Sequence, residues 1–469
     1  MFTTRSPETT LDPVVDHPRI TVLGVGYLGA THAVCMAALG FDVLGVDVDQ
    51  EKIDELTSGH VPFFEPGLQE QLSEMLHAGR LAFTTDFDQA VRFGDVHFIC
   101  VGTPQSIDSN AADLTFVERA FEALASRAHR KALLVGKSTV PIGTAERLTA
   151  MVTARAPIGD ALELAWNPEF LREGFAVDDT LHPDRLVFGV ASGWAERQLR
   201  AVYAPILRRG TPLVVADLAT AELVKVAANS FLATKISYIN AMAEVCEATG
   251  ADVDVLAEAL SYDERIGGRF LKPGLGFGGG CLPKDLRAFA HRAEELGVGR
   301  AVAFLHEIDD INTRRRLRFV DLVRDLAGGD LQGARVAALG AAFKPNSDDV
   351  RDAPALDVAR MLALEGAIVV VYDPEANENA HRTYPDLDYA GSLREAVTDA
   401  DVVALLTEWE EFGRADPDEI GALVNRRRIV DGRHALDAVA YREAGWTFRA
   451  LGQPAGAGHV APYEAEPVT

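Results

Sequence analysis

The fold is decided by one early stretch, which reads Arg19-Ile-Thr-Val-Leu23, Gly24-Val-Gly26-Tyr-Leu-Gly29, an Ala-rich segment to about Leu39, and Phe41-Asp-Val-Leu-Gly-Val46 followed by Asp47. It has the order strand, GxGxxG turn, helix, strand and acid. The glycines permit a tight turn, a close approach of the backbone to a pyrophosphate and close helix packing, while the helix N-terminus faces the phosphates. The stretch therefore predicts a dinucleotide-binding unit built on a parallel sheet.

The acid at the end of the second strand indicates which dinucleotide is bound. Asp47 follows Gly29 by 18 residues, which places it to hydrogen-bond a ribose 2′-hydroxyl. A carboxylate there would repel a 2′-phosphate, so NAD is favoured over NADP. The dinucleotide-binding residues expected in this part of the chain are Gly24, Gly26, Tyr27, Leu28, Gly29, Asp47 and Lys52.

Two further apolar runs, residues 95–101 and 132–135, predict strands and end in polar turns that contain Thr103 and Thr139. Because ligands of a doubly wound sheet bind beyond the carboxyl ends of its strands, both threonines are expected to point toward the cofactor. The alternative is a local hydrogen bond from each hydroxyl to the turn backbone. Cys100 and Cys35 lie within a predicted strand and a predicted helix, so both are expected to be core side chains.

A polar segment follows, Ala165-Trp-Asn-Pro-Glu-Phe-Leu-Arg-Glu-Gly174. Glu169 and Glu173 are four residues apart and would share one face if the segment were helical. Two like charges on one face suit a site that positions polar groups. The alternative is a solvated surface turn.

Residues 220–249 have a helical pattern that places Glu222, Lys225 and Asn229 on one face among apolar neighbours. A lysine held there can donate to a developing oxyanion or have a depressed pKa. The alternative is a Glu222–Lys225 ion pair on a solvated face. A second helical stretch, residues 301–327, carries a basic run from Arg314 to Arg318, which we expect at the surface or at a subunit contact.

One cysteine has an unusual setting, Phe270-Leu-Lys-Pro-Gly-Leu-Gly-Phe-Gly-Gly-Gly-Cys281-Leu-Pro-Lys-Asp285. Glycines let the backbone adopt positive φ and approach a ligand closely. Pro283 suits the first position of a helix, so Cys281 is expected just ahead of a helix N-terminus. Such a position, with Lys284 nearby, lowers the pKa of a thiol and favours the nucleophilic thiolate. The alternative is a buried small side chain in a glycine-rich turn.

A second α/β pattern begins after Gly328-Gly329, with predicted strands at residues 335–340, 367–372, 401–407 and 428–431 and a helix at 353–363. The loop 342–351 follows the carboxyl end of a strand, where a ligand should bind. Lys344 and Arg351 could meet anionic groups there, and Arg433 is a similar candidate after the last strand. For each of these cations the alternative is a surface charge.

The composition bounds the class of protein. With 469 residues the chain is too long for one core, and 48% hydrophobic and 25% charged residues are typical of a globular protein. The net charge of −25 argues against nucleic acid or an anionic membrane as the main partner. Four cysteines without CxxC or Cys/His metal spacing predict no metal site and no disulfide framework. With no apolar run of transmembrane length and no signal peptide, we expect a reduced, cytoplasmic protein.

Six motifs recur in the same order in one known family: Gly24-Val-Gly-Tyr-Leu-Gly29, Ser138-Thr-Val-Pro141, Asn167-Pro-Glu-Phe-Leu-Arg-Glu-Gly174, Lys225 with Asn229, Gly276-Phe-Gly-Gly-Gly-Cys-Leu-Pro-Lys-Asp285, and Phe343-Lys-Pro-Asn-Ser-Asp-Asp-Val-Arg351. Over about residues 19–450 the chain resembles the UDP-glucose/GDP-mannose dehydrogenase family. The resemblance implies an α/β fold with an N-terminal Rossmann-like NAD domain, a central helical dimerisation region and a C-terminal Rossmann-like nucleotide-sugar domain. We place these at residues 19–213, 214–328 and 329–452, between mobile tails at 1–18 and 453–469.

The activity implied by the resemblance is the four-electron oxidation of UDP-glucose to UDP-glucuronate by two NAD+, in a homodimer or higher homo-oligomer. Cys281 is the implied nucleophile, which captures the aldehyde as a thiohemiacetal that becomes a thioester and is hydrolysed. The implied catalytic residues are Cys281, Lys225, Asn229, Asp285, Glu169 and Thr139. The group that takes the first alcohol proton stays open between Lys225, Glu169 and a water bound to Asp285.

The resemblance also implies two binding sets. The cofactor set adds Thr103, Thr139, Glu173, Lys284 and Arg351 to the residues of the glycine turn. The substrate set is Glu169, Phe170, Leu171, Lys225, Asn229, Arg265, Phe270, Gly278, Phe343, Lys344 and Arg433, with Arg265 reaching the substrate of the neighbouring subunit. Ser347 and His434 depart from the threonine and asparagine that are usual in the family.

Three other functions stay open at this stage. GDP-mannose is the alternative sugar nucleotide, because GDP-mannose 6-dehydrogenases share much of the Asn167–Gly174 motif. A simple two-electron NAD dehydrogenase would share the first domain, but it needs neither an activated cysteine nor a third domain. A non-catalytic nucleotide-sugar binding protein would be expected to lack Cys281, Lys225 or Asp285.

Overall fold

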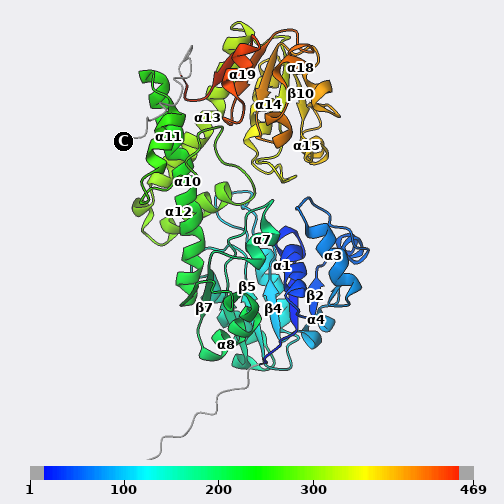
Figure 1. The fold of residues 1–469 in the computed structure, drawn as a ribbon. Coiled ribbons are helices and arrows are strands. Elements are labelled where there is room, and N and C mark those ends of the chain that lie inside the picture. The colour runs from blue at the N-terminus through cyan, green and yellow to red at the C-terminus, as the bar shows by residue number, and fades with distance from the viewer. Residues whose placement is uncertain (1–14, 454–469) are drawn as a thin grey trace, which may run out of the picture. The chain divides into compact units, whose positions relative to one another are not determined.

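The computed structural model describes residues 15–453, and the chain divides into two compact units whose border lies between Ala228 and Asn229 (Figure 1). We call residues 1–228 the first unit and residues 229–469 the second unit, and we describe each by itself. The long helix α10 (Leu218–Thr249) crosses the border, so its first turns belong to the first unit and the rest to the second.

The first unit is built on an eight-stranded sheet of order β3-β2-β1-β4-β5-β6-β7-β8. All neighbouring strands are parallel except β6 and β7. The order of its first six strands is that of a doubly wound dinucleotide-binding sheet, as the opening motif predicts. The strands are β1 (Ile20–Leu23), β2 (Val43–Val46), β3 (Leu81–Thr84), β4 (Val96–Ile99), β5 (Ala132–Gly136), β6 (Leu162–Trp166), β7 (Leu186–Val190) and β8 (Leu213–Ala216).

Helices cover both faces of this sheet, which explains why β1, β2, β4 and β5 are buried along their whole length. The helices of the first unit are α1 (Tyr27–Ala38), α2 (Gln50–Thr57), α3 (Leu68–His77), α4 (Phe87–Phe93), α5 (Thr115–Ala125), α6 (Thr144–Arg155), α7 (Ala176–Leu181), α8 (Gly193–Val202) and α9 (Ala204–Leu207), with the 3₁₀ turn η1 (Gly159–Ala161). Two separate apolar clusters result, one of them built around β1, α1 and α3.

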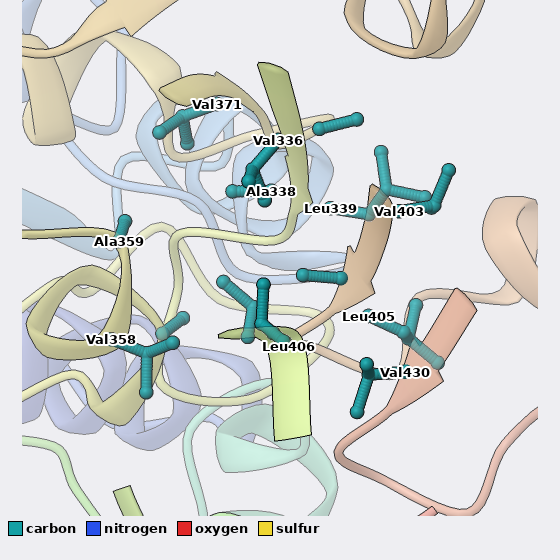
Figure 2. Packing of buried hydrophobic residues seen from close by; sticks show 14 of the residues in the cluster. Val336, Ala338, Leu339, Val358, Ala359, Val371, Val403, Leu405, Leu406 and Val430 are labelled. Carbon is teal, nitrogen blue, oxygen red and sulfur yellow. The ribbon is translucent and has the colours of Figure 1, made fainter. Parts of the chain in front are cut away.

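The second unit contains a six-stranded, all-parallel sheet of order β11-β10-β9-β12-β13-β14. Its strands are β9 (Arg335–Leu339), β10 (Ile368–Tyr372), β11 (Asp388–Tyr389), β12 (Val402–Leu405), β13 (Arg428–Asp431) and β14 (Thr447–Ala450). Figure 2 shows its core, a single apolar cluster that includes Val336, Val371, Val403 and Val430 of four strands and Val358 and Ala359 of one helix. Each of these valines contributes roughly 1.5–3 kcal/mol when it is fully buried.

The remaining elements of the second unit are helical. They are α11 (Val253–Ser261), α12 (Leu282–Glu295), η2 (Gly299–Ala301), α13 (Phe304–Ala327), α14 (Pro354–Leu364), α15 (Asn377–Thr383), α16 (Leu393–Val397), α17 (Glu410–Gly413), α18 (Pro417–Gly421) and α19 (Ala438–Glu443). Helix α13 packs against both α12 and α14, so it joins the helical region to the sheet within this unit.

The predicted fold class is confirmed, and the predicted strands and helices lie within a few residues of the observed ones. The condition under which Glu169 and Glu173 would share a helix face is not met, because the segment from Asn167 to Phe175 is not helical and α7 begins only at Ala176. One expectation is wrong. The basic run on α13 is not a surface feature throughout, because the side chains of Arg315 and Arg316 are buried.

Two further expectations concern the ends of the chain and the membrane. The predicted tails lie almost entirely outside the described residues. Among residues 15–453, no helix has the length and apolar character needed to cross a membrane.

Candidate active site

The glycine turn of the first unit has the shape that a dinucleotide requires. Gly24 has a φ of +81°, and a Cβ at Gly29 would lie 1.8 Å from the carbonyl oxygen of Gly24. Gly26 caps α1 without a side chain, and a Cβ there would meet no atom within 4 Å. The turn is therefore closed on its protein side and open on the other, so that the N-terminus of α1 can face a pyrophosphate.

Asp47 lies at the end of β2 and is tied to this turn. Its Oδ2 atom accepts from the backbone N–H of Val25 at 2.9 Å and from Lys52 Nζ at 3.3 Å, and its Oδ1 atom accepts from the backbone of Asp49 at 3.1 Å. A carboxylate has about four acceptor positions, so one remains for a ribose hydroxyl. Lys52 thus lies beside the acid, and its ammonium is fixed by it.

A buried glutamate that the sequence analysis missed connects the glycine turn to the segment before α7. Glu65 accepts from the backbone N–H of Gly174 at 2.6 Å and from that of Ala176 at 2.7 Å, and it also accepts from the hydroxyl of Tyr27. Burial and the neighbouring Glu65 raise the pKa of Tyr27 far above its usual range. The sequence signal was a charged residue inside an otherwise apolar Pro-Phe-Phe-Glu-Pro-Gly stretch, residues 62–67.

The ends of β4 and β5 are joined by a threonine pair. Thr103 Oγ1 donates to the backbone carbonyl of Thr139 at 2.9 Å, which is a bond between two strand ends 36 residues apart and not the local turn bond named as the alternative. Just before it, Lys137 is buried and donates to Asn167 Oδ1 at 3.0 Å and to the Tyr203 hydroxyl at 3.3 Å. Burial lowers the pKa of Lys137. This lysine received no role in the sequence analysis, although it directly precedes Ser138.

Glu169 and Lys225 form a buried ion pair in the first unit. Lys225 Nζ donates to Glu169 Oε1 at 2.9 Å, and only 6% and 11% of the two side chains are exposed. The other carboxylate oxygen accepts from the backbone of Leu171 at 2.8 Å. The aromatic ring of Phe170 lies 5.6 Å from the same ammonium. The structure therefore brings together Glu169, Phe170, Leu171 and Lys225, which the sequence placed 54 or more residues apart in two motifs.

Glu222, one turn before Lys225, has a different task. Its two carboxylate oxygens accept from the backbone N–H groups of Gly143 at 2.7 Å and of Ala145 at 2.6 Å, at the start of α6. A carboxylate there complements the helix dipole. Glu222 therefore fixes α10 to the turn that follows Thr139. Glu173, the second acid of the polar segment, is half-buried and lies close enough to Tyr27 to influence its hydroxyl.

In the second unit, Cys281 is the N-cap residue of α12, and Pro283 stands in its first turn. Cys281 is exposed, whereas Cys35, Cys100 and Cys246 are buried. The position just ahead of a helix is confirmed. Cys35, Cys100 and Cys246 are free thiols, and the described residues contain no group of three or more potential metal ligands.

Asp285 lies one turn into α12 and is buried. Its Oδ2 atom accepts from Asn229 Nδ2 at 2.7 Å, and its Oδ1 atom accepts from Lys284 Nζ at 2.5 Å. Asn229 of α10 is also buried, so its amide meets the carboxylate of Asp285 and the ammonium of Lys284 at the helix end that Cys281 caps. Lys225 precedes Asn229 by one helical turn on α10, so the two side chains project from the same face of that helix.

The other expected binding residues of the second unit lie around the glycine loop that precedes Cys281. A Cβ at Gly278 would lie 2.3 Å from the carbonyl oxygen of Asp352, one at Gly279 would lie 2.8 Å from the ring of Phe343, and one at Gly280 would lie 2.3 Å from the guanidinium carbon of Arg351. Lys344 Nζ lies 5.3 Å from the centre of the Phe343 ring. Phe343, Arg351 and Gly278–Gly280 are therefore in direct contact.

Arg433 is held by three backbone carbonyls and is not a surface charge. It donates to Leu406 O at 2.7 Å, to Gly276 O at 3.2 Å and to Phe343 O at 3.3 Å, and burial lowers its pKa. Phe270 has a φ of 64° and is 39% exposed. Arg265 is exposed and pairs with Asp263 at 2.6 Å, apart from the other substrate residues.

The fold and the site together define a dehydrogenase with a dinucleotide-binding sheet, a second nucleotide-type sheet and an exposed cysteine. Family models agree: the NAD binding domain of the UDP-glucose/GDP-mannose dehydrogenase family matches residues 18–207, the central domain matches 219–314 and the UDP binding domain matches 337–438. The chain belongs to this family, it is an NAD-dependent enzyme, and NAD is its cofactor.

Several named relatives cover nearly the whole chain. A UDP-glucose 6-dehydrogenase of Rhizobium meliloti (strain 1021) is 39% identical over 93% of this chain and all of its own length. The UDP-glucose 6-dehydrogenase TuaD of Bacillus subtilis is 36% identical over 93% of this chain and 94% of its own. A UDP-glucose dehydrogenase structure from Pyrobaculum islandicum is 37% identical and superposes with a TM-score of 0.86 over 93% of this chain and 98% of its own. All three domains are thus matched, which excludes a simple dehydrogenase without a third domain.

Proposed function

We propose that this enzyme oxidises UDP-glucose to UDP-glucuronate in a four-electron reaction with a covalent intermediate on Cys281. One observation carries the proposal: an exposed cysteine caps α12, and the buried Asp285 in the first turn of the same helix accepts a hydrogen bond from the buried Asn229 of α10. The names of relatives that are 36–39% identical over nearly the whole chain support UDP-glucose as the substrate.

The reaction converts UDP-glucose, two NAD+ and water into UDP-glucuronate, two NADH and protons. Bound NAD+ supplies the hydride acceptor for each oxidation, and the residues of the glycine turn, Asp47 and Lys52 would hold it, with Thr103, Glu173, Lys284 and Arg351. Cys281 Sγ attacks the aldehyde carbon, which forms the C–S bond of a thiohemiacetal. After the second oxidation, water attacks the thioester carbon, the C–S bond breaks and the thiol is restored.

In this proposal the polar and charged side chains have complementary catalytic roles. Lys225 and Asn229 stabilise the oxyanions of the tetrahedral states, because an ammonium and an amide N–H both donate to developing negative charge. Asp285 and Glu169 hold or activate water, with the Thr139 hydroxyl as a further donor. The first alcohol proton goes to Lys225, Glu169 or a water on Asp285. The Lys225–Glu169 distance of 2.9 Å supports an exchange of that proton within the pair.

The sugar nucleotide would be bound by Phe270, Gly278, Phe343, Lys344 and Arg433, together with Glu169, Phe170 and Leu171. The buried contacts of Arg433 support a role in holding the surrounding loops as well. We also propose a homodimer in which Arg265 reaches the substrate of the neighbouring subunit, supported by its exposed position. A cytoplasmic location is also proposed, and the free thiols of Cys35, Cys100 and Cys246 support it.

The test is the number of NADH molecules formed per sugar nucleotide, with limiting UDP-glucose and excess NAD+. Two per sugar are expected, and one per sugar would overturn the four-electron reaction. GDP-mannose is the matched second substrate, because one family includes dehydrogenases for both. Turnover with GDP-mannose but not UDP-glucose would keep the chemistry and replace the substrate.

A further inference from the structure

The glycine loop before Cys281, residues 274–280, is held in place by groups that come from distant parts of the second unit. Gly274 N–H donates to Asn240 Oδ1 at 2.9 Å, Leu275 N–H donates to Gly432 O at 3.0 Å, and Gly279 N–H donates to Arg351 O at 2.9 Å. Five of the seven loop residues are glycines, so only Leu275 and Phe277, both buried, can hold the loop by side-chain packing. The conformation of the glycines therefore depends on the partners of the loop backbone.

Asn312 on α13 makes the most complete of these contacts. Its Oδ1 atom accepts from Phe277 N–H at 2.8 Å, and its Nδ2 atom donates to Phe277 O at 2.9 Å. Its side chain is buried, so both contacts are shielded from water. One amide thus satisfies both backbone groups of one loop residue, as a neighbouring strand would do.

The surroundings of this contact are tight and are reinforced from the same helix. A Cβ at Gly276 would lie 2.0 Å from Asn312 Oδ1, so any larger residue there would push the amide away. Arg316, one turn further along α13, donates to Phe277 O at 3.3 Å and forms an ion pair with Asp357. The part of the basic run that sequence reasoning placed at the surface therefore supports the same loop residue.

We propose that Asn312 is a positioning residue for Cys281. Phe277 is the last side chain before three consecutive glycines that lead to Cys281, and α12 begins directly after it. The thiol is therefore placed by two anchors, the Asn312–Phe277 contact on one side and the helix on the other. The inference rests on the proposed role of Cys281 as the nucleophile.

The contact is directional, which separates positioning from simple packing. An aspartate in place of Asn312 has almost the same volume and still accepts from Phe277 N–H, but it sets an oxygen against Phe277 O. Loss of a donor opposite a buried carbonyl then moves the loop without leaving a cavity.

The main test is Asn312→Asp, with alkylation of Cys281 by iodoacetamide as the readout. The three other cysteines are buried, so alkylation of the folded protein reports on Cys281, and Cys281→Ser provides the blank. We expect alkylation to slow by about 2- to 10-fold as the thiol leaves the helix N-terminus. We expect kcat to fall by about 10- to 100-fold. NAD affinity should stay at the parent value, because most of the proposed NAD-binding residues, including the glycine turn and Asp47, lie in the first unit.

The matched control is Asn377→Asp. Asn377 makes the same pair of backbone contacts elsewhere in the second unit, since it accepts from Asp373 N–H at 2.9 Å and donates to Ala390 O at 2.8 Å. Its variant should be alkylated at the parent rate. Equal slowing in both variants would show a general loss of structure and would overturn the proposal.

Gly276→Ala changes the same Asn312–Phe277 contact by a substitution in the loop. This variant tests the proposal if Asn312→Asp does not fold. The same slower alkylation and lower kcat with unchanged NAD affinity would support the proposal. Parent alkylation and parent kcat in either folded variant would overturn it. Alkylation needs no sugar nucleotide, so this result stands even if UDP-glucose proves to be the wrong substrate.

Discussion

The two glycine-rich segments of the chain, residues 24–29 and 274–280, use the same amino acid in different ways. The first turn is fixed locally: Gly29 fits against Gly24, and Asp47 at the end of the neighbouring strand accepts from Val25. The second loop is fixed by Asn240, Asn312 and the chain around Gly432, which lie 34 to 157 residues away. A short motif can therefore specify the conformation of the turn at residues 24–29. The loop at residues 274–280 takes its conformation only when the second unit is folded.

The largest expected effect comes from the end of the second loop. Cys281→Ser should lower the oxidation of UDP-glucose to UDP-glucuronate by at least about 1,000-fold, because the hydroxyl is a far weaker nucleophile than a thiolate. NAD affinity should be unchanged. The measurement is the NADH yield per sugar together with NAD titration, with Cys246→Ala, a buried cysteine, as the control. Full turnover in Cys281→Ser would show that Cys281 is not the nucleophile.

The next effect tests how the first turn selects its ligand. Asp47→Asn removes the charge from the acid beside Val25 and should weaken NAD binding by about 10- to 100-fold, since a hydrogen bond to a charged group contributes roughly 1.5–3 kcal/mol. The ratio of the affinity for NAD to the affinity for NADP should decrease. Asp49→Asn is the control, because Asp49 caps α2 in the same turn. An unchanged ratio of the two affinities would contradict the ribose contact.

Substitutions at two glycines of the first turn should show which side of the turn packs against the protein and which side faces the cofactor. Gly29→Ala should destabilise the protein by roughly 1–3 kcal/mol, because its Cβ would overlap the Gly24 carbonyl. Gly26→Ala should leave the melting temperature unchanged, since a Cβ there meets no protein atom, but should weaken NAD binding by about tenfold. Equal behaviour of the two variants would show that the open side of the turn does not face the cofactor.

A substitution at Arg265 tests whether a second copy of the chain contributes a residue to the sugar-nucleotide site. Arg265→Ala should raise the KM for UDP-glucose by about tenfold while the dimer stays intact, because a charge-assisted contact to the sugar nucleotide is lost. Arg269→Ala, an exposed arginine four residues further on, is the control. A parent KM in dimeric Arg265→Ala would end the case for a shared site.

The smallest effect concerns a histidine–aspartate pair of the second unit. His434 follows Arg433 and contacts Asp254 at 2.8 Å. Burial lowers its pKa, but the hydrogen bond and the charge of Asp254 outweigh this, so its pKa is raised overall, while the pKa of Asp254 is lowered. The imidazolium form therefore stabilises the fold fully below the ordinary histidine pKa of about 6.5, and this contribution is lost as the pH rises through the raised value.

The variant His434→Gln tests whether the stabilising contribution of His434 decreases as the pH rises. The difference in melting temperature between the parent and the variant should be largest below the ordinary histidine pKa of about 6.5 and should shrink as the pH rises above it. Other charges near the pair are those of Asp431 and Lys272. A difference that grew with rising pH would mean that His434 is neutral in the fold.

Much of the fold was predictable because its signals are local. The runs at residues 335–340 and 428–431 are apolar and bounded by polar turns, and both are strands in the structure. Whether Glu169 and Glu173 share a helix stayed open, because spacing alone does not show that a segment is helical, and the structure has no helix there. Glu65 and Asn312 were missed, because a single buried polar residue has no periodicity and acquires its meaning from partners 109 and 35 residues away.

The sequence by itself determined the dinucleotide turn, the acid that favours NAD, the helix that begins after Cys281 and the two α/β sheets, because each depends on neighbours along the chain. Only the tertiary structure decided that Glu169 pairs with Lys225, that Glu65 joins Tyr27 to Gly174, and that Asn312 holds the loop of the cysteine. The physical reason is that a buried polar group must find its hydrogen-bond partner in space, and the chain can supply that partner from any distance.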